Sequence, residues 1–75
     1  TIDYYLNNDE NVLIEIYNIK GQRIKEFNLG RQSKGNHTLV WNAMDNNNKN
    51  LPSGIYFTKM NIGNKSYLEK MILMK

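Results

Sequence analysis

The sequence predicts an all-β fold, a small antiparallel β-sandwich of about six to seven strands. Apolar residues recur at every second position in short runs, which is the period of a strand with one buried face, and no stretch has the period of an amphipathic helix. Clusters of Asn, Gly, Asp and Lys separate the runs, and these residues favour turns. The runs repeat at intervals of about ten residues, a spacing typical of sandwiches.

The first two runs alternate most regularly. A strand is predicted at residues 2–6, and a second begins after a polar turn at residues 7–11. β-Branched side chains pack well on a half-buried pleated surface, so we expect the Val and Ile positions of the second strand to point into the core. The inward-facing residues of the two strands are Ile2, Tyr4, Leu6, Val12, Ile14 and Ile16.

The third strand is less regular than the first two. A hairpin turn is predicted at residues 18–21, where Gly21 supplies the positive φ that such turns need, and the strand follows at residues 23–29. Simple alternation puts Ile24 and Phe27 on opposite faces. Either a bulge interrupts the strand or the strand lies at an edge of the sheet, and the sequence leaves both alternatives open.

The middle of the chain is predicted to contain two loops and one strand. Residues 30–36 read as a loop, after which His37, Leu39 and Trp41 share one face of a fourth strand. Leu39 and Trp41 are expected to complete the core begun by the second strand. Residues 45–50 are predicted to form a tight polar turn, because Asn and Asp tolerate the left-handed backbone and bond to their own main chain.

The last third of the chain predicts a hairpin of two strands, at residues 54–62 and 66–74, joined by a turn at residues 63–64. Both strands carry apolar residues on each face. Such strands are usually central in a sheet or covered by a neighbour, so we expect one of these positions for both. The residues concerned are Ile55 and Phe57 opposite Tyr56 and Met60, then Leu68 and Ile72 opposite Met71 and Leu73.

Composition limits the function classes. The net charge of +3 is spread along the chain without a run of one sign, which is not the pattern of a nucleic-acid footprint. The longest apolar stretch, Met71 to Met74, is far shorter than the roughly 20 residues of a membrane helix. With no cysteine, disulfides and thiolate metal sites are excluded. We expect residues 1–75 to form one domain, a C-terminal fragment of a larger secreted protein.

Several short segments occur in an order and at a spacing that point to a family. They are Val12-Leu13-Ile14-Glu15-Ile16-Tyr17-Asn18, Gly21-Gln22, Gly35-Asn36-His37, Trp41-Asn42-Ala43, Asp45, Ser53-Gly54-Ile55-Tyr56-Phe57 and Lys70-Met71-Ile72-Leu73. In this pattern the chain resembles the C-terminal sorting domain of the type IX (Por) secretion system, type A. It is similar, more distantly, to the Ig-like domain of the flagellar hook-capping protein.

The resemblance implies an Ig-like β-sandwich that ends a large exported protein of the Bacteroidetes or a related phylum. Such domains are read by an outer-membrane translocon, and in many members a sorting peptidase then cleaves them. The implied route runs through the periplasm to the cell surface or the medium, with the cargo in the same chain. The polar turn departs from the family pattern at Asn48, where Gly is common, and Asn is the next-best residue for a left-handed position.

Three candidate ligand sites each have a structural alternative that we favour. Trp41 suits a sugar-stacking platform, but a large aromatic residue on a strand face with Leu39 more often packs in a small core. His37 suits a metal ligand or a pH switch, but no cysteine and no close carboxylate accompany it. The turn at residues 45–50 suits calcium, which usually requires several carboxylates, whereas only Asp45 is present there.

The leading interpretation is a non-catalytic sorting signal that a translocon reads by shape and by pairing with a strand edge. One His, no Cys and seven scattered carboxylates provide no catalytic constellation, and no cofactor or metal is expected. The alternative is a carbohydrate-binding or structural accessory module of an extracellular enzyme or adhesin. A carbohydrate-binding module would present a flat, exposed row of aromatic side chains drawn from Tyr5, Tyr17, Trp41 or Tyr67. A basic strip formed by Lys65, Lys70 and Lys75 is a further candidate binding site. Alternatively, these lysines only keep an exposed strand edge soluble. The predicted recognition residues are Gly54, Tyr56, Lys70, Met71, Ile72, Leu73, Met74 and Lys75.

Overall fold

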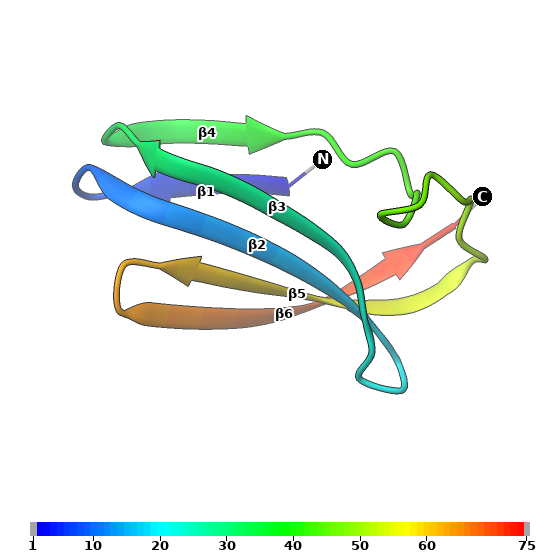
Figure 1. Cartoon of the computed structure of the whole chain (residues 1–75). Coiled ribbons are helices and arrows are strands. Elements are labelled where there is room, and N and C mark those ends of the chain that lie inside the picture. Colours follow the sequence, from blue (N-terminus) through cyan, green and yellow to red (C-terminus); the bar gives the residue numbers. More distant parts are fainter. Residues whose placement is uncertain (1, 75) are drawn as a thin grey trace.

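The computed structural model describes residues 2–74, in which two antiparallel sheets face each other (Figure 1). The smaller sheet pairs β1 with β4, and the larger sheet has the strand order β3-β2-β5-β6. The predicted all-β sandwich is therefore confirmed. The strands of this part of the chain are β1 (Ile2–Leu6), β2 (Glu10–Asn18), β3 (Arg23–Gln32), β4 (Gly35–Leu39), β5 (Gly54–Ile62) and β6 (Lys65–Leu73).

The core lies between the two sheets and is built around β2. This strand has neighbours on both sides, so its inward residues are enclosed by β3, β5 and the smaller sheet. Val12, Ile14 and Ile16 are almost completely shielded from solvent. Ile2 and Leu6 reach the same cluster from β1, and Tyr56 reaches it from β5; Leu39 and Trp41 are partly buried against it.

The sequence left open whether the third strand contains a bulge or lies at an edge of the sheet, and β3 does both. It is an edge strand, and its pairing with β2 shifts register twice. The pairs Val12–Gly30 and Leu13–Asn28 leave Leu29 as an extra residue, and a second shift leaves Ile24 unpaired in the same way. Each bulge changes the alternation, so Ile24, Phe27 and Leu29 all pack against the core.

The region after β3 differs from the prediction. β3 continues to Gln32 and β4 begins at Gly35, so the expected loop at residues 30–36 is reduced to residues 33–34. β4 ends at Leu39, where its pairing partner in β1 is Ile2, so Trp41 lies beyond the strand. Trp41 still packs against the core, held by a hydrogen bond of 3.0 Å from its Nε1 to the main-chain oxygen of Met44.

The polar turn at residues 45–50 forms as predicted. The Asp45 carboxylate accepts hydrogen bonds from the main-chain nitrogens of Asn47 and Lys49, both at 2.9 Å. Asn48 has a φ of 60°, the left-handed conformation expected for this position. The turn is thus organised by its own side chains.

The late hairpin matches the prediction in outline. β5 has the predicted bounds and a central position, whereas β6 begins and ends one residue earlier than expected and lies at the edge of the larger sheet. The expectation that both strands are central or covered is therefore wrong for β6. Its outward-facing apolar residues Leu68 and Ile72 have no neighbouring strand within residues 2–74 and remain exposed.

Candidate functional site

The predicted recognition residues lie on two opposite faces of the β5–β6 hairpin. In the antiparallel ladder Tyr56 is paired with Met71 and Gly54 with Leu73, on the face toward the core, while Phe57 is paired with Lys70 on the outer face. Side chains alternate along a strand, so a continuous stretch of sequence cannot form one surface. Of the predicted set, Lys75 lies outside the described residues.

The inward members of the predicted set belong to the core. Tyr56 is 5% exposed, and its hydroxyl donates a hydrogen bond of 2.6 Å to the main-chain oxygen of Pro52. A tyrosine near the start of a strand that bonds back to the preceding loop is the tyrosine corner found in Ig-like sandwiches. Its ring meets Trp41 edge to face at 6.0 Å, and Met71 and Leu73 pack partly buried beside this pair. In the folded domain Tyr56 is thus a structural residue.

The outward members lie in a patch that we call the outer strip, formed by Ile55, Phe57, Leu68, Lys70 and Ile72; Phe57 is half-buried and the other four are exposed. Ile55 is paired with Ile72 and Phe57 with Lys70, and Leu68 lies diagonally next to Phe57. Leu68 and Ile72 are each 67% exposed. Met74, which follows β6, is 84% exposed. Leu68, Ile55 and Phe57 were not among the predicted recognition residues. Leu68 could have been predicted, because every second residue of a strand lies on the same face, and Leu68 shares that face with Lys70 and Ile72.

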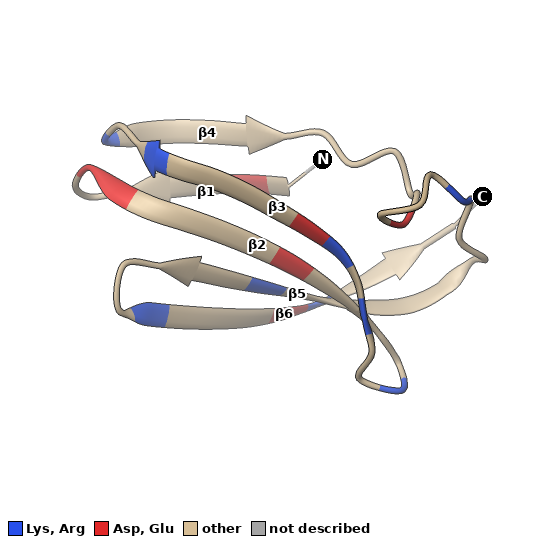
Figure 2. Ribbon diagram, viewed as in Figure 1, with Lys and Arg blue, Asp and Glu red and all other residues tan. Residues whose placement is uncertain are grey.

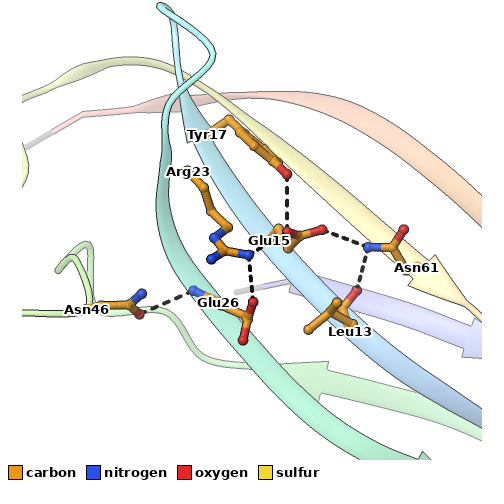
Figure 3. Close-up of polar contacts among 7 residues, drawn as sticks. All are labelled: Leu13, Glu15, Tyr17, Arg23, Glu26, Asn46 and Asn61. Carbon is orange, nitrogen blue, oxygen red and sulfur yellow. Dashed lines mark hydrogen bonds and ion pairs between the residues drawn. The ribbon is translucent and has the colours of Figure 1, made fainter.

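A polar network borders the outer strip along β2 (Figure 3). The Glu15 carboxylate receives hydrogen bonds from Arg23 at 3.2 Å, from Asn61 at 3.0 Å and from the Tyr17 hydroxyl at 3.2 Å. Arg23 also pairs with Glu26 at 2.8 Å. These contacts cover Glu15, which is only 8% exposed although it faces outward.

The network fixes the charge of its central carboxylate. Burial alone raises the pKa of Glu15, but the hydrogen bonds from Arg23, Asn61 and Tyr17, together with the charge of Arg23, outweigh burial and hold this pKa below its ordinary value. The pKa of the Tyr17 phenol is raised by burial and by its bond to Glu15. Glu15 therefore stays ionised at neutral pH and gives this side of the outer strip a defined polar border.

The other candidate residues have local structural partners. Trp41 is partly buried and makes the core contacts described above. The His37 ring stacks on Tyr4 at 5.2 Å, and its Nε2 lies 2.6 Å from the main-chain oxygen of Ser33, to which it donates. Tyr5 and Tyr67 are about half exposed.

The predicted basic strip does not form in the described part of the chain. Lys65 and Lys70 are separated by five residues, so alternation places them on opposite faces of β6. Figure 2 shows basic and acidic residues interspersed along the strands. Between residues 2 and 74 no group of three or more His, Cys, Asp and Glu side chains is placed to hold a metal ion. The same residues contain no helix long and apolar enough to cross a membrane.

The arrangement is therefore one of contact surfaces: an edge strand, an apolar outer strip and a polar border. Comparison with family models finds the FlgD Ig-like domain over residues 1–66. The match includes β1 to β5 and ends at the start of β6, so the three outer-strip residues on β6, Leu68, Lys70 and Ile72, all lie beyond it. Searches of curated proteins and of solved structures found no match.

Proposed function

The chain belongs to the FlgD Ig-like domain family, and from this premise we propose that it is a non-catalytic sorting domain that directs an attached cargo protein through the type IX secretion system. Its partners in this proposal are an outer-membrane translocon, a sorting peptidase and the cargo domain of the same protein. Any enzymatic activity lies in that cargo. The domain passes through the periplasm and reaches the cell surface or the medium.

One observation carries the proposal: the outer strip is displayed on an edge strand. In residues 2–74 β6 has a neighbour on one side only, so its second edge offers main-chain N–H and C=O groups to an incoming strand. Leu68 and Ile72 stand exposed beside that edge. Edge pairing combined with side-chain contacts is a common way of recognising a partner by shape. The sequence segments of the last third, which resemble the type IX sorting domains, fall on this same hairpin.

The test transfers the domain to a passive cargo. Residues 1–75 are fused behind a fluorescent reporter that carries its own inner-membrane signal peptide, in a host that has the type IX system. We expect most of the reporter at the surface or in the medium. A fusion that ends at Glu69 lacks Lys70 and Ile72 of the outer strip together with the core-facing Met71 and Leu73, and we expect its reporter to stay fluorescent but remain in the periplasm.

Two controls make the result specific. The intact fusion in a host without the translocon should also remain in the periplasm. Undiminished delivery of the fusion that ends at Glu69, or periplasmic retention of the intact fusion in both hosts, would contradict the proposal. Retention in both hosts combined with a stable contact between reporter and domain would favour the alternative, a structural accessory module.

A further inference from the structure

The two sheets of the sandwich are unequal, and the smaller one leaves part of the larger one uncovered. β1 and β4 face a sheet of four strands, and the second edge of β1 has no partner within residues 2–74. On the inner face, Tyr56 and Thr58 of β5 are buried. On β6, Met71 is partly buried opposite Tyr56, whereas Glu69 and Tyr67, paired with Thr58 and Met60, are exposed. The cover over β6 therefore ends between Met71 and Glu69.

A groove of about 620 Å³ occupies the uncovered space. One wall is β1 along its whole length, and the floor and other wall come from the inner faces of β5 and β6. Met60 and Ile62 of β5 and Met71 of β6 make the floor apolar. The volume lies in the range of sites that hold a small molecule or a short peptide. This groove is on the opposite face of the hairpin from the outer strip, so the two surfaces can be tested separately.

The floor contains an unsatisfied polar group. Thr58 lines the groove, is only 4% exposed, and its hydroxyl has no hydrogen-bond partner in the described chain. Buried hydroxyl groups are normally bonded, and leaving one unbonded costs about 1–3 kcal/mol. The unpartnered hydroxyl is therefore a local energetic cost beneath the floor of the groove.

The charges around the groove are unbalanced. Asp3, Glu10 and Glu69 line it, against the single base Lys65. The chain as a whole is basic, with a net charge of +3, so this acidic lining differs from the average surface. Asp3 accepts a hydrogen bond from the Thr38 hydroxyl. Glu10 and Glu69 are therefore the carboxylates that we expect a ligand to contact. A basic occupant is thus favoured over an acidic one.

We propose that the groove binds an extended peptide segment of a partner protein, which adds to the free edge of β1 as a third strand of the smaller sheet. The free edge requires an extended backbone, because only a strand satisfies the row of main-chain groups along β1. Because side chains alternate along a strand, every second residue of the bound segment faces the groove. Apolar side chains rest on Met60 and Met71, and a lysine or arginine between them meets Glu69.

The test uses two capped synthetic peptides. The first, Thr-Val-Thr-Lys-Thr-Val-Thr, presents two valines and the lysine on one face, and the second carries glutamate in place of the lysine. Each is titrated into the isotope-labelled chain, and amide chemical shifts are followed by NMR. We expect saturable shifts from the lysine peptide at Ile2 to Leu6 and at Tyr67 to Met71, with slowed hydrogen exchange along β1. The glutamate peptide should bind roughly tenfold more weakly.

Reversing one charge in the groove gives the sharper comparison. Glu69→Lys, at an exposed position, should reverse the preference between the two peptides. The double variant Ile19→Lys with Val40→Lys makes the same change in net charge at exposed positions outside the groove and should leave the preference as it was. Thermal melting shows that each variant is folded before the titration.

Three results would overturn the proposal. The first is the absence of saturable shifts, and the second is a set of shifts that spares β1. The third is a concentration-dependent dimer, seen by sedimentation and abolished by Glu69→Lys, which would make a second copy of the chain the occupant. None of these results alters the delivery expected from the outer strip, and failure of delivery leaves the peptide result standing.

Discussion

Individual side chains show how closely the polar surface of this small sandwich is organised. Glu15 is the clearest case, since an outward-facing carboxylate on a central strand would ordinarily be solvated, yet three neighbours hold it. The sequence predicted which strand carries Glu15 and which way it points. It gave no indication of the network, because Arg23 and Asn61 come from two other strands and their proximity depends on the register.

Glu15 leads to a prediction about pH. The pKa of this carboxyl is lower in the folded chain than its ordinary value of 4.5, so the stabilisation is present above pH 4.5 and is lost as the pH falls through the folded pKa. In Glu15→Gln that contribution is absent at every pH. We expect the difference in free energy of unfolding between the parent and this variant to be largest near neutral pH and to shrink toward acid.

Urea unfolding at a series of pH values from neutral to acid measures this difference. Tyr17→Phe removes one of the three donors and serves as the matched variant, since the pKa of Glu15 should then lie closer to its ordinary value and the pH-dependent difference should be smaller. A difference between parent and Glu15→Gln that is constant over the whole range would contradict the assignment.

Asn48 has the left-handed backbone conformation that its residue type and its place in the turn predict. Its φ of 60° is left-handed, which asparagine tolerates and β-branched residues do not. We expect Asn48→Val to lower the free energy of unfolding by about 1–2 kcal/mol and Asn48→Gly to change it by less than about 0.5 kcal/mol. Asn47→Val, at the adjacent exposed position, is the control and should have little effect. Chemical denaturation of the three variants would refute the account if Asn48→Val proved as stable as Asn48→Gly.

At the scale of elements, alternation and turn residues predicted the strands well and their positions in the sheets less well. The strand over residues 12–17 and its buried face followed directly from the spacing of Val12, Ile14 and Ile16, whereas β2 also includes Glu10, Asn11 and Asn18, which were predicted to lie in turns. The two bulges of β3 did not, because a bulge depends on where the partner strand lies and not on the local pattern alone. The edge position of β6 was missed for a related reason: apolar residues on both faces usually indicate a central strand, and here one face forms the outer strip.

The contrast between a central and an edge strand gives a prediction of its own. Ile14 is fully buried in β2, whereas Ile72 on β6 is 67% exposed, so the same deletion of one methylene group has different consequences. Ile14→Val should lower the free energy of unfolding by about 0.5–1.5 kcal/mol, and Ile72→Val should change it by less than about 0.5 kcal/mol. Equal losses in guanidinium unfolding of the two variants would mean that the outer strip is covered and that its proposed exposure is wrong.

At the scale of the whole molecule, the two faces of the β5–β6 hairpin have different tasks. The inner face anchors the hairpin to the core through Tyr56 and, farther along, lines the groove; the outer face carries the outer strip. The sequence identified the hairpin as the informative segment, but it treated residues 70–75 as one signal. The alternation of β6 divides that segment: Lys70 and Ile72 face outward with the outer strip, whereas Met71 and Leu73 face the core and Met71 also lines the groove.

The most direct measurement of the central claim compares delivery of the fluorescent reporter by two double variants of the domain. Leu68→Lys with Ile72→Lys alters the outer strip, and Ile19→Lys with Val40→Lys makes the same change in charge and hydrophobicity at exposed residues elsewhere; Ile19 and Val40 are 69% and 71% exposed. All four positions are exposed, so both variants should melt close to the parent. We predict that the first loses most surface delivery and that the second keeps it. Equal delivery by the two folded variants would contradict the account.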